Sequence, residues 1–145
     1  MPPFAPRLAA PRISEKSALK IDDPAVLAEV TAACDRYEDA LMTNDLDTLD
    51  ALFHPAPTTL RYGVGENLYG IEEIRAFRKG RAGGSPQRTV LRRVITTYGD
   101  DFATSNLEFQ RPGAERVGRQ SQTWMRTEAG WRIVAAHVSL MGTTS

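Results

Sequence analysis

The first stretch that could carry chemistry is RYGVGENLYG, residues 61–70, where an arginine precedes three closely spaced glycines. The glycines follow the spacing G-x-G-x-x-x-x-G, which is not the dinucleotide-binding fingerprint, and no βαβ unit or later ribose-binding acid accompanies them. The pattern therefore predicts a glycine-punctuated bend between two short strands. Arg61 has two interpretations: it reaches solvent along a strand edge, or its guanidinium grips a carboxylate through two hydrogen bonds.

Two further reactive side chains fall on one predicted helix. Apolar residues recur at helical spacing after Asp23 and Pro24, and Cys34 and Tyr37 belong to the inward stripe. A buried tyrosine hydroxyl needs a partner, so Tyr37 is either a core residue bonded to a backbone carbonyl or a reactive group in a pocket. Cys34 is interpreted as core, because no histidine is near it in sequence.

Polar residues also alternate along the last two predicted strands. In WRIVAAHVSLM, residues 131–141, strand alternation would place His137 and Ser139 on the same face as Trp131. His137 is then either a hydrogen-bonded core histidine or part of a pocket wall. In the preceding strand Gln122 and Trp124 share a face, and parity alone leaves open which face is inward.

Composition argues against several classes of function. Eighteen basic residues offset eighteen acidic ones, which removes the electrostatic case for a nucleic-acid or membrane-surface partner. Two histidines and one cysteine show no ligand spacing, so we expect no metal, and no cofactor motif is present. The chain also lacks a G-x-S-x-G elbow for a serine nucleophile.

The chain length predicts one domain. Residues 1–20 are proline-rich and lack the apolar run of a signal peptide, so we expect a flexible arm there and a single domain over residues 21–145. Cys34 is the only cysteine, which favours a reducing compartment and hence the cytoplasm.

The elements that must position these side chains follow from the change in hydrophobic period. Helical spacing indicates two helices before residue 54 and a short third one near residues 71–77. Strand-like runs cover residues 58–62, 89–98, 102–110, 116–126 and 131–140, and short connections join the last four. Helices before hairpin-linked strands predict an α+β fold with a curved, largely antiparallel sheet.

This order, together with DRYEDAL, TLRYGVGENLYG, EIRAFR and GRQSQTWMRTEAGWRIVAAHVSLM, resembles the nuclear transport factor 2-like, or SnoaL-like, superfamily. Within it, the chain is similar to oxalurate-catabolism proteins and 1,3-dicarboxyurea hydrolases over residues 21–141. The resemblance implies a cone-shaped sheet whose mouth three N-terminal helices close around a pocket. It also implies a homodimer. A larger apolar residue is expected at position 34.

The same resemblance implies a hydrolase or decarboxylase that acts on N-carboxylated ureas in bacterial cyanuric acid and oxalurate catabolism. Its proposed catalytic pair falls on Tyr37 and Arg61. Arg61 would bind one carboxylate of a small anionic ureide, and Tyr37 would donate a proton to the departing nitrogen or orient a water. Arg75 has two interpretations, a ligand for a second carboxylate or a solvated helix residue. The neutral hydrogen-bonding groups assigned to the substrate are Asn67, Gln122, His137 and Ser139.

Three other functions stay open. An isomerase or cyclase of the same fold would need a carboxylate base in an apolar pocket, for which Glu108 is the candidate. A binding module without catalysis is the second. The third is an accessory subunit for a neighbouring amidase, docked through residues 1–20.

Overall fold

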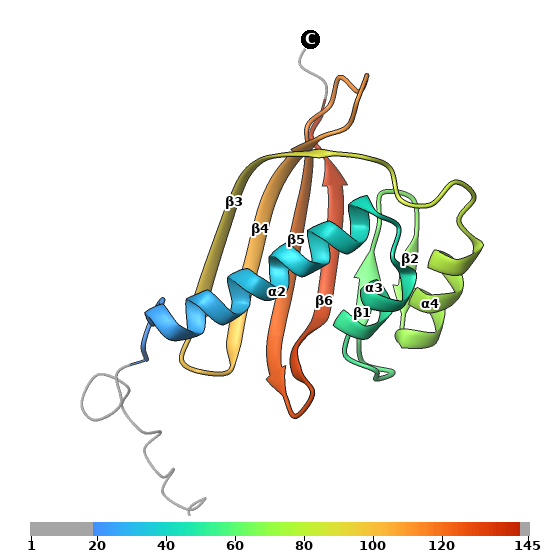
Figure 1. Cartoon of the computed structure of the whole chain (residues 1–145). Coiled ribbons are helices and arrows are strands. Elements are labelled where there is room, and N and C mark those ends of the chain that lie inside the picture. Colours follow the sequence, from blue (N-terminus) through green and yellow to red (C-terminus); the bar gives the residue numbers. More distant parts are fainter. Residues whose placement is uncertain (1–18, 143–145) are drawn as a thin grey trace, which may run out of the picture.

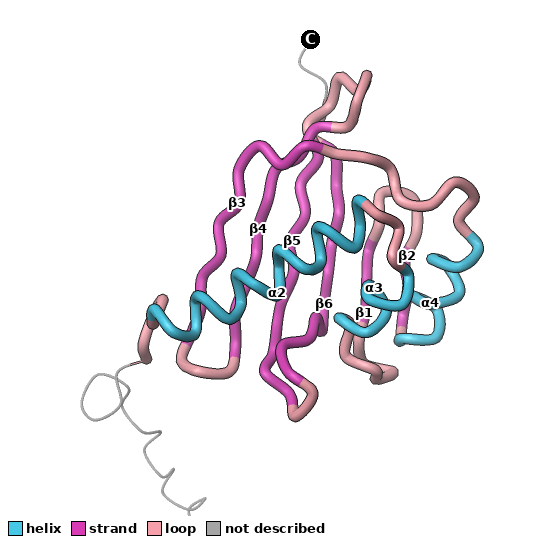
Figure 2. Tube along the Cα trace, in the orientation of Figure 1, coloured by secondary structure: helices cyan, strands magenta, loops and turns pink. Residues whose placement is uncertain are grey.

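The computed structural model describes residues 19–142. The arm predicted for residues 1–20 therefore lies almost wholly outside the described residues. Within them, three helices precede the long strands, as the hydrophobic period predicts. The α+β class is confirmed (Figures 1 and 2).

Each of the first two helices begins where an aspartate can cap it. Helix α2 spans Pro24–Met42, and the Asp23 side chain accepts a hydrogen bond from the Val26 amide. Helix α3 spans Leu46–Leu52, and Asp45 accepts one from the Thr48 amide. A cap satisfies amides that have no partner inside the helix, so these residues fix where each helix starts. Helix α4, Ile71–Gly80, follows Gly70, whose φ of 85° favours glycine.

Six strands form one sheet in the order β2-β1-β6-β5-β4-β3. The short strands are β1 (Leu60–Tyr62) and β2 (Asn67–Tyr69). The long ones are β3 (Thr89–Tyr98), β4 (Phe102–Gln110), β5 (Gly118–Thr127) and β6 (Gly130–Leu140). All neighbours are antiparallel except β1 and β6, which run parallel. β1 is thus an interior strand, between β2 and β6.

The three helices cover one face of the curved sheet, and the main core lies between them (Figure 1). Helix α2 crosses the sheet and α4 packs beside the β1–β2 hairpin. The chain between α4 and β3 then passes over the end of the sheet (Figure 1). This connection consists of residues 81–88.

A bulge in β6 changes which residues face the core. Thr123 pairs with Ala135 but Trp124 pairs with Ile133, so Val134 has no partner across the ladder. One extra residue reverses the side-chain alternation beyond it. Inward positions therefore change from odd to even numbers along the strand, and the buried residues of β6 are Trp131, Ile133, Ala136 and Val138.

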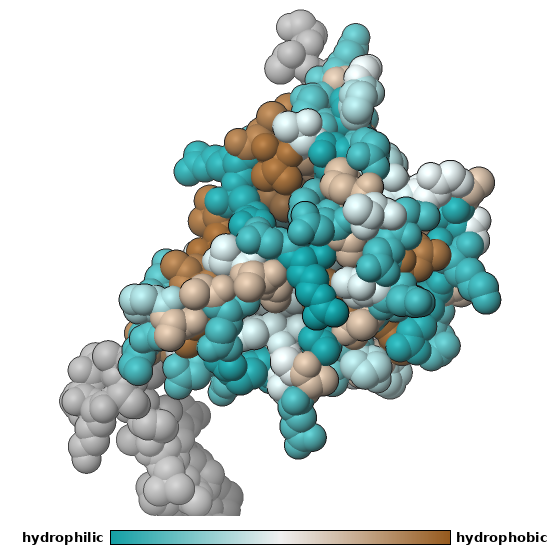
Figure 3. Space-filling model, in the orientation of Figure 1, coloured by the Kyte–Doolittle hydropathy of each residue, from teal (hydrophilic) through white to brown (hydrophobic). Residues whose placement is uncertain are grey.

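Hydrophobic side chains also lie on the surface near β3. Figure 3 shows them gathered along that side of the molecule, where Leu91 and Val94 are about half exposed. Exposed apolar side chains of this kind are compatible with contact to another protein surface, although single ones need no explanation.

Candidate functional site

A cavity of about 250 Å³ opens between α2, β1, the inner face of β5 and β6, and loop residues 81–88. Its wall combines apolar, hydroxyl and strongly charged side chains. The lining residues are Tyr37, Leu41, Arg61, Val64, Glu66, Arg81, Ser85, Pro86, Arg88, Arg111, Gln120 and Val138. Both members of the proposed catalytic pair, Tyr37 and Arg61, line this one cavity.

Tyr37 comes from the buried stripe of α2. Its side chain is 4% exposed, and its ring meets the Phe53 ring edge-on at 6.3 Å. Such an aromatic contact limits ring rotation. The tyrosine is therefore a fixed part of the cavity wall.

Arg61 points to the same side of the sheet as the core. Its register partners are Leu68 on β2 and Ala136 on β6, and both are buried. Residues directly opposite in a ladder share a face, so Arg61 faces inward too. Its side chain is 13% exposed and its guanidinium carbon lies 5.9 Å from the centre of the Phe77 ring. The interpretation of Arg61 as a solvent-exposed edge residue is wrong, because β2 occupies the edge.

The glycine-rich stretch, residues 61–70, contains an acidic residue, Glu66, whose carboxylate lies beside Arg61. Glu66 Oε1 lies 3.1 Å from Arg61 Nη1, and Glu66 Oε2 accepts a hydrogen bond from the Gly65 amide at 3.2 Å. A Cβ on Gly63 would overlap the Glu66 carboxylate, so a larger residue there would displace this side chain from its present position. The loop thus folds an acidic side chain back onto Arg61.

Arg88 reaches the cavity from the connection before β3 and forms an ion pair with Glu38 of α2. Its Nε and Nη2 donate to the two Glu38 carboxylate oxygens at 2.9 and 2.8 Å. The same guanidinium lies 4.7 Å from the centre of the Phe109 ring. A two-point ion pair against an aromatic face fixes both orientation and charge.

Two more arginines line the cavity without such a partner. Arg81 lies over the Phe77 ring at 4.8 Å, and Arg111 lies over the Phe109 ring at 5.3 Å. Within residues 19–142, no carboxylate oxygen is within 4.0 Å of either guanidinium. Burial lowers the pKa of each, and neighbouring arginines, Arg61 among them, lower the pKa further. The cavity is therefore strongly positive and suits an anion.

Two glutamines lie on the inner face of β5, and only one of them lines the cavity. Gln120 is buried beside Val138 and is in the lining. Gln122 is the next inward residue along β5 and pairs with Ala136 of β6. Its side-chain oxygen accepts a hydrogen bond from Trp124 Nε1 at 3.1 Å. Its Nε2 is buried with no hydrogen-bond partner in the described part of the chain. Gln122 therefore faces inward, a direction that strand alternation left open, but it does not line the cavity.

The structure places two other predicted binding residues on the surface. Asn67 is exposed on β2. Arg75 is exposed on α4, with its Nη1 3.3 Å from Glu72 Oε1. Of the two interpretations of Arg75, the structure agrees with a solvated helix residue. Neither side chain lines the cavity.

His137 and Ser139 lie on the outer side of the sheet, so their expected position beside Trp131 is wrong. Because the bulge at Val134 reverses the alternation, Ala136 and Val138 face inward instead. His137 is exposed and its ring meets the Tyr62 ring edge-on at 5.6 Å. Neither residue lines the cavity.

Cys34 belongs to the main core and does not line the cavity. Burial raises the pKa of its thiol to about 11, so at neutral pH it is an uncharged, apolar side chain. Within residues 19–142, no three His, Cys, Asp or Glu side chains are grouped to hold a metal ion. None of the described helices is long and apolar enough to cross a membrane.

Sequence reasoning missed most of the lining, including the polar residue Ser85 and five side chains with longer polar or charged groups. The five are Glu66, Arg81, Arg88, Arg111 and Gln120. Gln120 shares parity with Gln122 and was within reach of the pattern. The others lie in loops or next to them, where side-chain direction follows no period.

A family model described as AtzH-like matches residues 19–144. Among solved structures, a protein of unknown function from Pectobacterium atrosepticum SCRI1043 is 56% identical; the match covers 84% of this chain and 95% of that one, with a TM-score of 0.80. A cystatin-like fold protein from Burkholderia xenovorans LB400 is 44% identical, covering 87% and 99%, with a TM-score of 0.82. A nuclear transport factor 2-like superfamily protein from Salmonella enterica is 25% identical, covering 83% and 94%, with a TM-score of 0.67. No curated protein matches the chain.

Proposed function

The chain belongs to the AtzH-like family, and from that premise we propose that its cavity binds a small N-carboxylated urea such as 1,3-dicarboxyurea and releases one carboxylate as carbon dioxide. The observation that carries the proposal is the shared cavity of Tyr37 and Arg61, whose lining contains four arginines and one acidic residue, Glu66. A second glutamate, Glu38, pairs with one of these arginines, Arg88. A doubly charged, planar carboxylate ligand matches guanidinium groups in both charge and shape.

The reaction needs a held carboxylate and one proton. An N-carboxylate breaks down when its nitrogen is protonated: the carbon–nitrogen bond breaks, its electron pair stays on nitrogen, and carbon dioxide leaves. We assign the proton to the Tyr37 hydroxyl, which then recovers a proton from solvent. We assign Arg61 the role of holding the reacting carboxylate beside Tyr37 and offsetting its charge.

Arg61 must exchange partners for this to happen. In the structure its guanidinium is paired with Glu66 at 3.1 Å. A substrate carboxylate takes the place of Glu66, and the neighbouring positive side chains favour that exchange. Glu66 therefore sets the affinity of the first carboxylate site.

The decisive experiment supplies freshly generated 1,3-dicarboxyurea to the purified protein and follows carbon dioxide and allophanate. We expect Tyr37→Phe and Arg61→Lys each to lower kcat/KM about a hundredfold or more, the usual size of a lost proton donor or oriented charge. Arg75→Lys is the matched control, because Arg75 is exposed and outside the cavity. It should turn over like the wild type.

Two outcomes contradict the proposal. Full turnover by Tyr37→Phe would show that the phenol is not the proton donor. Tight binding of the dicarboxyurea without release of carbon dioxide would instead favour a binding module or an accessory role beside an amidase.

A further inference from the structure

The four cavity arginines divide into two that have a glutamate partner and two that have none among the described residues. Arg61 and Arg88 each have a glutamate partner at 3.1 and 2.8 Å. Arg81 and Arg111 have none among residues 19–142 within 4.0 Å. The second pair therefore presents charge that the described protein leaves without an acidic partner.

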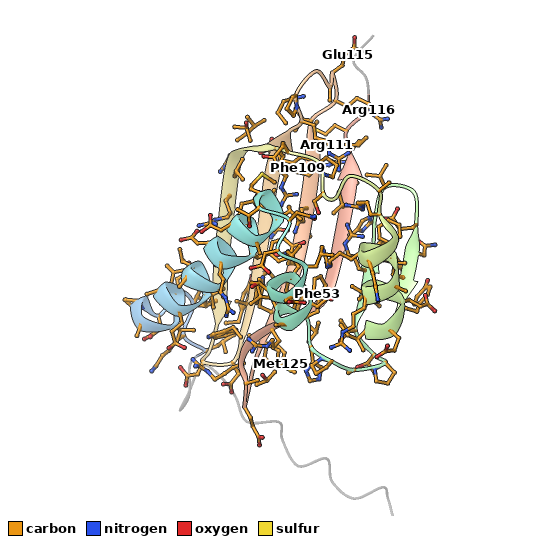
Figure 4. The ribbon with its side chains drawn as sticks, turned by 45° about the vertical axis from the view of Figure 1, so that its right-hand side comes forward. Phe53, Phe109, Arg111, Glu115, Arg116 and Met125 are labelled. Atoms are coloured by element: carbon orange, nitrogen blue, oxygen red, sulfur yellow. The ribbon has the colours of Figure 1, made fainter. Side chains whose placement is uncertain are left out.

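Both of these guanidinium groups are held in place by aromatic rings. Arg81 stacks on Phe77 of α4 at 4.8 Å, and Arg111 stacks on Phe109 of β4 at 5.3 Å. Phe109 is 0% exposed, so the surface under Arg111 is rigid. Figure 4 shows Phe109 and Arg111 close together at the end of the sheet that the connection to β3 crosses. Ordered side chains lose less freedom when a ligand binds.

Holding these groups near each other is unfavourable without a ligand. Arg111 Nε is buried with no hydrogen-bond partner in the described part of the chain. A buried donor left without an acceptor, next to other positive groups, costs free energy that an anion would recover. The arrangement is that of a site prepared for an acidic group.

We propose that Arg81 and Arg111 bind a second carboxylate, so that the cavity selects dianions that bridge from Arg61 to this pair. The proposal rests on the proposed function for the identity of the physiological ligand, a dicarboxylated urea. It adds that the retained carboxylate is anchored at the Arg81–Arg111 pair while the reacting one lies beside Tyr37. The product has lost one carboxylate and can no longer bridge the two sites, which favours its release.

Stable dicarboxylates test the site without any turnover. Binding of malonate, succinate and glutarate is compared with binding of acetate by calorimetry, at one ionic strength. Charge-assisted hydrogen bonds at a second site predict that at least one dicarboxylate binds about 10- to 100-fold more tightly than acetate. The preference is the ratio of the two dissociation constants, and it should fall to about one in R81Q/R111Q; acetate itself should bind more weakly there, because that variant loses the arginines that have no glutamate partner.

Control variants keep the outcome interpretable. Arg75→Gln removes one positive charge outside the cavity, against two in the double variant, and should keep the full preference for dicarboxylates. If R81Q/R111Q fails to fold, the conservative R81K/R111K variant keeps the charges but loses the planar fork, and its preference should fall by a smaller factor. An equal preference in wild type and the folded double variant, or none in wild type, would overturn the proposal.

Failure of this proposal and failure of the proposed function are distinguishable. If the protein prefers dicarboxylates but releases no carbon dioxide from 1,3-dicarboxyurea, the Arg81–Arg111 site is supported and the proposed catalysis is refuted. If the protein turns over 1,3-dicarboxyurea but shows no preference for dicarboxylates, the proposed catalysis is supported and the second carboxylate site is refuted.

Discussion

Replacing Glu38 by glutamine should destabilise the protein strongly, because it leaves the Arg88 charge buried and unpaired. The Arg88 side chain is 5% exposed and that of Glu38 is 17% exposed. Two hydrogen bonds of 2.9 and 2.8 Å join them in the wild type. A glutamine offers one oxygen and no charge, so one of these bonds and the whole charge compensation are lost.

The expected loss follows from that geometry. Removing one partner of a buried ion pair costs about 3–5 kcal/mol, and the partial exposure of Glu38 lowers our expectation to about 2–3 kcal/mol. The stacking of Arg88 on Phe109 at 4.7 Å remains and does not compensate the charge. The same reasoning predicts that E38L/R88M recovers much of the loss, because no buried charge is left.

Urea unfolding is the assay, followed by the fluorescence of Trp124 and Trp131, both of which are buried. Glu72→Gln is the control: it removes the carboxylate from the exposed pair with Arg75 and should cost less than about 0.5 kcal/mol. If Glu38→Gln costs no more than this control, the two-point pair does not stabilise the fold and the reasoning is refuted.

Three further predictions test the core and the first carboxylate site. The pKa of the Cys34 thiol is raised to about 11 in the folded protein, against 9.0 for a free thiol, so the unfolded thiol ionises first as pH rises. The free energy of unfolding, measured in urea relative to Cys34→Ala, should therefore fall by about 1 kcal/mol between pH 8 and pH 10. A difference between the two proteins that does not change with pH would contradict the burial argument. Gly118→Ala should cost about 1–3 kcal/mol in thermal unfolding, because its Cβ would overlap the buried Phe109 ring, whereas Gly80→Ala meets no neighbour and should be neutral or stabilising. Glu66→Gln should tighten acetate binding in calorimetry, because a neutral amide competes less for Arg61; weaker binding would mean that Glu66 positions the arginine instead of competing for it.

Much of the fold follows from local patterns in the sequence. The change from helical to strand period placed the last four strands within two residues of β3 to β6. Asp23 and Asp45 begin helices because a short acidic side chain can satisfy the first amides. These signals are carried by residues close to each other in the chain, so no knowledge of tertiary contacts is needed to use them.

The residues of the candidate site could be predicted only in part from such local patterns. Tyr37 was expected on the inward stripe of its helix, because α2 keeps one period along its length. The direction of Arg61 was left open, since a strand of three residues carries too little pattern to choose a face. Its pairing with β6, far along the chain, decides that it points into the core.

What the sequence alone determined, then, is the order of helices and strands, the Asp23 cap and the stripe that carries Tyr37. Tertiary structure decided the rest. One unpaired residue, Val134, reverses the alternation and turns His137 outward, and alternation is a local rule that a single insertion breaks. Arg81 and Arg111 line one cavity because the chain after α4 crosses the end of the sheet, and such a placement depends on long-range packing that no periodic signal in the sequence records.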